Sequence, residues 1–174
     1  FFVNKDNKVD SLTFEEIRRI YSGEITNWSE VGGADAEIVA YQRPENSGSQ
    51  TGLYSLVMKD LPVKARTPKE SVNLSMAGII EYVSDYENRL DAIGYSYYYY
   101  ANEMYYNENL KYLDIDGVKP TYDTIKDESY PILTAYYIVT RKNETNENVL
   151  SLKENMLSDR GQEVATKAGY VPCK

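Results

Sequence analysis

The stretch Arg43-Pro44-Glu45-Asn46-Ser47-Gly48-Ser49-Gln50-Thr51 stands between two apolar runs of different character. The run before it, residues 38–41 (Ile-Val-Ala-Tyr), has the composition of a strand, and the run after it, residues 53–58, that of a helix. A strand, a small glycine-containing turn and a helix in succession are typical of α/β proteins. Strand-like and helix-like runs continue to alternate along the 174 residues, so we expect an α/β fold.

This turn also predicts a binding site for a small anion. The backbone N–H groups at the start of a helix point in one direction, and the helix dipole adds about half a positive charge there. Arg43 supplies a fork of donors that suits a tetrahedral oxyanion. Ser47, Ser49 and Thr51 add hydroxyl groups that can donate to the same anion. The chemistry indicated is capture of an anion and not its conversion.

A plainer interpretation of the same residues stays open. Serine at a helix start is commonly an N-cap, which accepts a hydrogen bond from one of the first amides. Arg43 would then be an ordinary surface charge.

Composition excludes several classes of function. The net charge of −8 and an isoelectric point near 4.7 argue against a nucleic-acid-binding protein, which carries a basic patch. There is no histidine, no Ser-x-x-Lys pattern beside the serines, and one cysteine, Cys173, without metal-ligand spacing around it. We therefore expect neither an enzyme nor a bound metal or cofactor.

Targeting features are also few. No run of 18 or more apolar residues predicts a membrane span, and Phe1-Phe2-Val3 does not resemble a signal peptide. Because the chain begins without Met, in a strand-like run, we expect it to be a processed or shortened part of a longer protein.

Periodicity and capping signals predict the order of the elements. Thr13 and Glu16 form a capping box, and Gly23 is placed to end the helix that follows. Strands are expected at 1–5, 38–41, 92–95, 110–115 and 132–140; helices at 14–22, 48–59, from about Asn73 with Leu74 on its apolar face, at 149–157, and from Ser158 to Gly169; a turn at 27–33; and a polar loop at 122–129.

Tyrosine is frequent, with 18 residues, four of them at 97–100. Such a cluster can stack on sugars, but packing at half-buried positions is the more common use of tyrosine.

Taken together, the motifs resemble those of the substrate-binding proteins of bacterial phosphate ABC transporters, which have the type II periplasmic-binding-protein clamshell fold. The resemblance covers nearly the whole chain, in the family's order. The matching segments are 12–17 (Leu-Thr-Phe-Glu-Glu-Ile), 20–28 (Ile-Tyr-Ser-Gly-Glu-Ile-Thr-Asn-Trp), 31–33 (Val-Gly-Gly), Arg43 with 47–51, 92–96 (Ala-Ile-Gly-Tyr-Ser), 130–132 (Tyr-Pro-Ile), 158–162 (Ser-Asp-Arg-Gly-Gln) and 169–172 (Gly-Tyr-Val-Pro).

The resemblance implies one lobe of the clamshell, a mixed sheet flanked by helices, over residues 9–128. Residues 1–8 and 129–174 are then crossover strands and C-terminal helices of an incomplete second lobe, so about half of the binding cleft is expected outside this chain. In the family, an Arg four residues before a Ser-Gly-Thr turn contacts phosphate; here Ser49 replaces the Thr. The implied phosphate-binding residues are Arg43, Ser47, Gly48, Ser49, Gln50 and Thr51.

The implied function is that of the extracytoplasmic solute-binding component of a phosphate ABC importer. Its partners are inorganic phosphate and the membrane permease, with a lipid anchor upstream as the only link to the membrane, as in a cell-surface lipoprotein or a periplasmic protein. Glu45 is a weak candidate for the carboxylate that accepts the phosphate proton, because the family places that acceptor in the other lobe. Two alternatives stay open: a related oxyanion (sulfate, molybdate or a phosphonate), and a surface interaction module that uses Tyr97–Tyr100 as its contact face.

Overall fold

The computed structural model describes residues 1–70, 75–85, 87 and 90–173. At its centre is a four-stranded sheet in the order β3 (Val39–Ala40), β4 (Ala92–Gly94), β1 (Phe2–Asn4) and β5 (Leu110–Tyr112). β3 and β4 are parallel, whereas β1 is antiparallel to both of its neighbours, β4 and β5. The sheet is therefore mixed, as expected.

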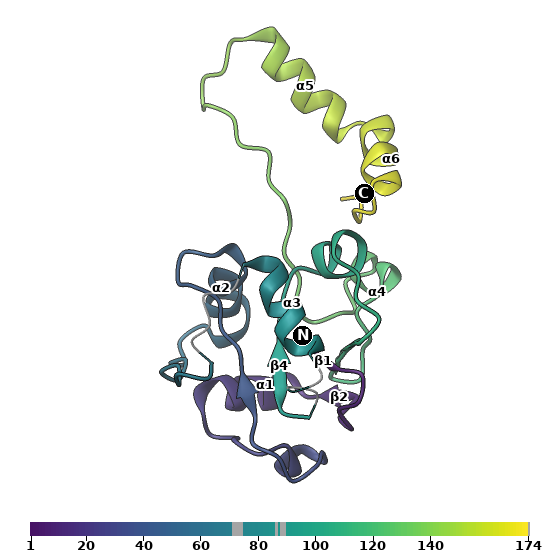
Figure 1. The fold of residues 1–174 in the computed structure, drawn as a ribbon. Helices are drawn as coiled ribbons and strands as arrows, with labels where there is room; N and C mark the ends of the chain where they lie inside the picture. Colours follow the sequence, from purple (N-terminus) through teal and green to yellow (C-terminus); the bar gives the residue numbers. More distant parts are fainter. Residues whose placement is uncertain (71–74, 86, 88–89, 174) are drawn as a thin grey trace.

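Helices cover both faces of this sheet. Neighbouring residues in a strand point to opposite faces, so Val3 and Ile93 join one core cluster and Phe2 and Ala92 the other. The first cluster packs against α1 (Phe14–Ser22) and the helical segment η2 (Leu53–Met58), and the second against α3 (Met76–Ser84). This three-layer arrangement, visible in Figure 1, confirms the α/β prediction.

Local signals explain where α1 begins and ends. The Thr13 side chain accepts from the Glu16 amide, and the Glu16 carboxylate accepts from the Thr13 amide at 2.7 Å. Gly23 ends the helix in the left-handed region with a φ of 88°, which favours glycine. Ile17, Ile20 and Tyr21 are fully buried, so the capping and the apolar stripe both match the expectation.

The other elements complete the chain. A two-stranded parallel pair joins β2 (Ser11–Leu12) to β6 (Asp114–Ile115), so the strand expected at 110–115 is divided between two sheets. α3 has Ser75 as its N-cap, close to the expected start, while Asn73 and Leu74 lie outside the described residues. The remaining helical segments are η1 (Trp28–Val31), α2 (Gly48–Gly52), η4 (Tyr100–Met104), α4 (Tyr122–Lys126), α5 (Glu147–Leu157) and α6 (Asp159–Lys167).

The prediction of a polar loop at 122–129 is wrong, because α4 occupies Tyr122–Lys126. The Thr121 side chain caps this helix by accepting from the Thr124 amide at 3.2 Å, and the Thr124 hydroxyl accepts from the Thr121 amide at 2.9 Å. Ile125 packs against the first core cluster. A threonine pair that caps itself is a weaker sequence signal than Ser/Thr followed by Glu, which is why the polar composition misled the prediction.

The prediction of a long strand at 132–140 is also wrong. Residues 133–141 have no regular secondary structure, and Tyr136, Tyr137 and Val139 are 74%, 80% and 88% exposed. Tyrosine and branched residues favour a strand only where a neighbouring strand accepts the backbone hydrogen bonds. No residue among those described pairs with this segment.

The C-terminal helices form as predicted but stand away from the sheet (Figure 1). Ser158 caps α6 by accepting from the Gly161 amide at 3.2 Å. Beyond α6 the chain returns to the lobe, where the Tyr170 ring stacks on Tyr99 with ring centroids 3.8 Å apart.

β1 bears on the expected division of the chain. Phe2–Asn4 pair on both sides with strands of the lobe assigned to 9–128. A two-lobe division therefore stays a proposal, in which the sheet of the first lobe includes β1.

Candidate anion-binding site

The predicted site lies where the chain leaves β3 and enters α2. Ser47 is the N-cap of α2, and its hydroxyl accepts from the Gln50 amide at 3.2 Å. α2 continues without interruption into η2, so the helical segment runs from Gly48 to Met58. The expected strand, turn and helix are all present.

Two backbone N–H groups at this helix start donate no hydrogen bond to the described residues. The Gln50 amide is bound by Ser47, and the Thr51 amide donates to the Ser47 carbonyl at 3.0 Å. Within the described part of the chain, the amides of Gly48 and Ser49 have no hydrogen-bond acceptor. The N-cap interpretation is confirmed, and because the cap uses one amide and leaves two, the anion site stays a prediction for those two.

Arg43 is not an ordinary surface charge, because only 8% of the residue is exposed. Burial lowers the pKa of its guanidinium, and the nearby hydroxyls of Tyr95 and Tyr100 act in the opposite direction. An arginine pKa starts so high that the group stays charged at neutral pH. A partly desolvated positive charge interacts with an anion more strongly than an exposed one does.

The three hydroxyl residues differ in what they offer. Ser49 is 7% exposed and lines a large cavity of about 1690 Å³. The Ser47 hydroxyl acts as the cap, and the Thr51 hydroxyl donates to the Ser47 carbonyl at 3.1 Å. Ser49 is therefore the hydroxyl best placed for a ligand.

Gln50 differs from the expectation. It is fully buried, and its amide oxygen accepts from the backbone amide of Arg43 at 2.9 Å and from the Tyr95 hydroxyl. Its side chain is committed to the interior and is not at the surface of the site. Sequence reasoning missed Tyr95 as well, since a tyrosine at the end of an apolar strand gives no signal beyond packing.

The large cavity separates the lobe from the C-terminal segment. Its lobe side includes Ser49, Tyr95 and Tyr97, and its other side comes from residues 132–138 and from α5 and α6. The Tyr97 hydroxyl donates to the Gly48 carbonyl at 3.0 Å, which ties the tyrosine-rich segment to the start of α2.

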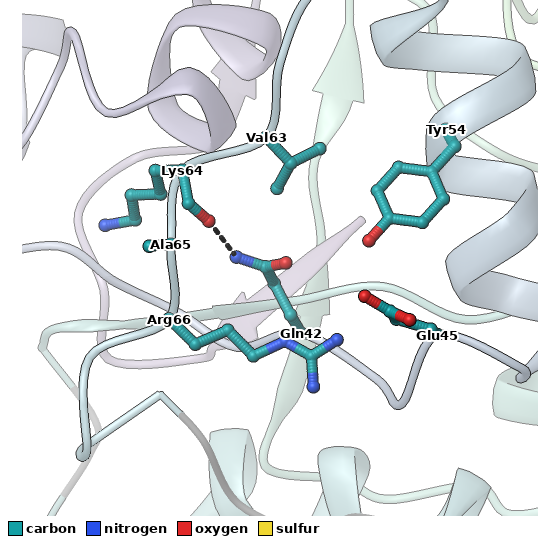
Figure 2. A pocket seen from close by; sticks show the side chains of 7 residues that line it. All are labelled: Gln42, Glu45, Tyr54, Val63, Lys64, Ala65 and Arg66. Carbon is teal, nitrogen blue, oxygen red and sulfur yellow. Dashed lines mark hydrogen bonds between the residues drawn. The ribbon is translucent and has the colours of Figure 1, made fainter.

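A second, smaller cavity of about 430 Å³ shares no lining residue with the large one (Figure 2). Glu45 lines it together with Gln42, Tyr54 and Arg66, and Figure 2 shows the Glu45 carboxylate beside the Tyr54 ring. Glu45 does not line the large cavity that contains Ser49, so its geometry gives no support to a role as phosphate proton acceptor.

The four tyrosines at 97–100 are half-buried and used in packing, as expected. Tyr98 packs on Tyr112, Tyr99 on Tyr170 and Tyr100 on Tyr105.

Two further searches covered the described residues alone. They contain no cluster of three or more carboxylate or cysteine side chains that could hold a metal ion. No helix among them has the length and apolar character of a membrane span.

Comparison with known proteins gives consistent matches. The curated phosphate-binding protein PstS of Borreliella burgdorferi is 27% identical over 178 residues, which cover 100% of this chain and 62% of that protein. PstS of Staphylococcus saprophyticus is 31% identical over 176 residues, covering 97% of this chain and 53% of the relative. The crystal structure of an ABC-type phosphate transport receptor from Vibrio cholerae superposes with a TM-score of 0.78 at 25% identity, over 98% of this chain and 67% of that one.

The chain thus spans little more than half the length of the curated relatives it matches. The family model described as the PBP superfamily domain matches residues 1–164, which is nearly the whole chain. The resemblance drawn from the motifs is confirmed, and the chain belongs to the PBP (periplasmic-binding-protein) superfamily domain family.

Proposed function

We propose that this chain belongs to the extracytoplasmic solute-binding component of a phosphate ABC importer. It binds inorganic phosphate at the start of α2 and, within the whole protein, delivers it to the membrane permease. The observation that carries the proposal is the pair of open amides, Gly48 and Ser49, at a helix start that follows the buried Arg43 by five residues. The relatives are named as phosphate-binding proteins and a transport receptor, which agrees with binding and not with catalysis.

Each group of the proposed site has its own role in the proposal. The Gly48 and Ser49 amides and the Ser49 hydroxyl supply donors in a fixed direction, and Arg43 supplies the charge. Hydrogen bonds from such donors to an anion contribute roughly 1.5–3 kcal/mol each. Gln50 acts behind this surface, and the Ser47 and Thr51 hydroxyls hold the turn together.

The division into lobes is part of the same proposal. Residues 9–128 with β1 form one lobe, and 129–174 belong to a second that contacts the ligand from across the large cavity. Closure of two lobes on a ligand draws the closed state into dominance, because the ligand contacts both. Location outside the cytoplasm, with a lipid anchor upstream, follows from the same role.

The chain by itself supplies the contacts of one lobe. A few charge-assisted hydrogen bonds must overcome an association cost of at least about 4 kcal/mol. We expect phosphate to bind with a dissociation constant in the millimolar range, measured by calorimetry or amide NMR. Saturation at low micromolar phosphate would mean that one lobe suffices and that the proposed division is wrong.

Arg43→Ala tests the site itself. Loss of the guanidinium is expected to weaken phosphate binding about 10- to 100-fold, in line with one or two charge-assisted bonds. Arg66→Ala is the matched control, since Arg66 lines the smaller cavity and its removal changes the net charge equally. Equal losses in both variants would indicate a general charge effect and contradict the proposed site.

Competition with sulfate, molybdate and a phosphonate in the same titration separates phosphate from the related oxyanions. If one of these anions binds more strongly than phosphate, that anion and not phosphate is the ligand of the site.

A further inference from the structure

A chain of buried side-chain amides lies directly behind the anion site. Gln50 is fully buried and Tyr95 is 5% exposed. The Gln50 Oε1 atom accepts from the Arg43 backbone N–H at 2.9 Å and from the Tyr95 hydroxyl. The same Arg43 N–H also lies 3.1 Å from the Tyr95 oxygen, so two side chains hold one backbone group.

The network continues away from the site. The Gln50 Nε2 atom donates to Gln42 Oε1 at 3.4 Å, and Gln42 Nε2 donates to the Lys64 carbonyl at 3.2 Å. Gln42 is 1% exposed. The Gln50 oxygen accepts from two donors and the Gln50 nitrogen donates to one acceptor, which fixes the amide orientation. A flipped amide would place its NH2 group against the Arg43 N–H and its oxygen against Gln42 Oε1.

The position of Gln50 gives this network a consequence for binding. Gln50 is the third residue of α2, in the same helical turn as the open amides of Gly48 and Ser49. Through its side chain, that turn is bonded to the backbone from which the Arg43 side chain extends. One buried residue therefore joins the two halves of the proposed site, the helix start and the guanidinium.

We infer that Gln50 and Tyr95 are positioning residues of the anion site, which set the distance and direction of Arg43 relative to the Gly48 and Ser49 amides. This inference rests on the proposed function. A neutral amide and a neutral phenol suit the role, since neither repels an anion a short distance away. Burial raises the pKa of Tyr95, which keeps its hydroxyl protonated at physiological pH.

Three variants of the full 174-residue chain test the inference. Gln50→Met keeps the volume and removes all three hydrogen bonds of the side chain, and Tyr95→Phe removes one hydroxyl. Gln42→Met is the matched control: it removes an equally buried glutamine from the same network and keeps the hydrogen bonds from the Arg43 N–H to Gln50 and Tyr95. Each variant is titrated with inorganic phosphate by amide NMR, and its melting temperature is measured.

Gln50→Met is expected to weaken phosphate binding about tenfold and Tyr95→Phe about threefold, as expected for a small misplacement of one binding group. Gln42→Met is expected to change affinity less than about twofold while lowering the melting temperature about as much as Gln50→Met. Equal effects of Gln42→Met and Gln50→Met on affinity, or none from Gln50→Met and Tyr95→Phe, would overturn the inference.

The spectra without phosphate keep the inference separate from the proposed function. Positioning predicts that Gln50→Met and Tyr95→Phe shift the amide signals of Arg43, Gly48 and Ser49, and that Gln42→Met leaves Gly48 and Ser49 unchanged. Should the unmodified chain fail to bind phosphate, the proposed function falls, and these shifts still decide whether Gln50 and Tyr95 set the geometry. Unshifted Gly48 and Ser49 signals in both site variants would refute positioning. Tyr95→Phe alone decides the question if Gln50→Met does not fold.

Discussion

The sheet-centred lobe and the C-terminal segment both contain helices with apolar side chains, but the environments of these side chains differ. In the lobe, α1 presents Ile17, Ile20 and Tyr21 to a closed core. In the segment after Tyr130, by contrast, none of the described residues 131–173 is buried, although α5 and α6 carry apolar residues. Leu152 and Val164 are each 61% exposed.

The difference separates local from tertiary determinants of structure. α6 begins at its predicted cap, Ser158, without a buried residue, because a cap needs only its own first turn. The segment 132–140 has strand composition but no neighbouring strand within the described chain, and it forms none. A helix and its cap are thus determined by residues within one segment, whereas a strand forms only when a second strand pairs with it.

The largest expected contrast is in core stability. Leu12 is 1% exposed in the lobe, and Leu152 on α5 is 61% exposed. Leu12→Ala is expected to lower the free energy of unfolding by about 2–5 kcal/mol, from lost burial and the cavity left behind. Leu152→Ala is expected to change it by less than about 0.5 kcal/mol. Urea unfolding followed by the fluorescence of Trp28, the one tryptophan and fully buried in the lobe, measures both.

A substantial loss in Leu152→Ala would mean that α5 packs on the lobe in solution and would remove the contrast between the two regions.

A smaller contrast is expected between two helix caps of equal geometry. The Ser47 and Ser158 hydroxyls each accept from a backbone amide at 3.2 Å. Ser47→Ala is expected to lower the unfolding free energy of the lobe by about 1 kcal/mol, because α2 is part of the cooperative core. Ser158→Ala is expected to leave that value unchanged and to speed hydrogen exchange in the first turn of α6 only. Equal effects on Trp28-detected unfolding would contradict independent behaviour of the two regions.

The smallest expected effect is a dependence of lobe stability on pH. Burial alone would raise the pKa of Glu70, but hydrogen bonds from Lys64 and Thr67 outweigh it and hold the pKa below its usual value of 4.5. A carboxylate of this kind stabilises the fold above that usual value and loses its contribution as the pH falls through the lowered pKa. Lobe stability should therefore fall below about pH 4.5, and Glu70→Gln should flatten the fall.

Urea midpoints between pH 3 and 7 provide the measurement, with Glu154→Gln on the exposed face of α5 as control. An unchanged acid profile in Glu70→Gln would assign the loss of stability to other carboxylates.

Sequence predicted those features of the fold that depend on neighbouring residues. The capping box at Thr13, the glycine end at Gly23 and the cap at Ser47 all follow from residue types three or four positions apart. Motif order also indicated the family. α4 was missed because its cap is a threonine pair, and the strand at 132–140 failed because pairing depends on residues far away in the chain.

At the candidate site, the sequence predicted the strand, the turn and the helix start, but not the hydrogen bonds behind them. Ser47 caps the helix start as the turn pattern implied, and Arg43 is buried five residues before Gly48; contact of these residues with phosphate stays a prediction. Gln50 was assigned to the ligand because it lies among these residues. Its inward direction depends on the Arg43 amide and on Tyr95, which is far away in the sequence. No pattern of spacing carries that information.

The central place of β1 affects how the chain folds as it is made. Val3 pairs with Ile93 on one side and Lys111 on the other, so β1 leaves the ribosome before either of the two strands that flank it. At a synthesis rate of about 5–20 residues per second, the nascent strand stays unpaired for several seconds. Such distant pairing gives a high contact order and slow folding, so the nascent lobe exposes Phe2 to chaperones and to other nascent chains until β5 has emerged.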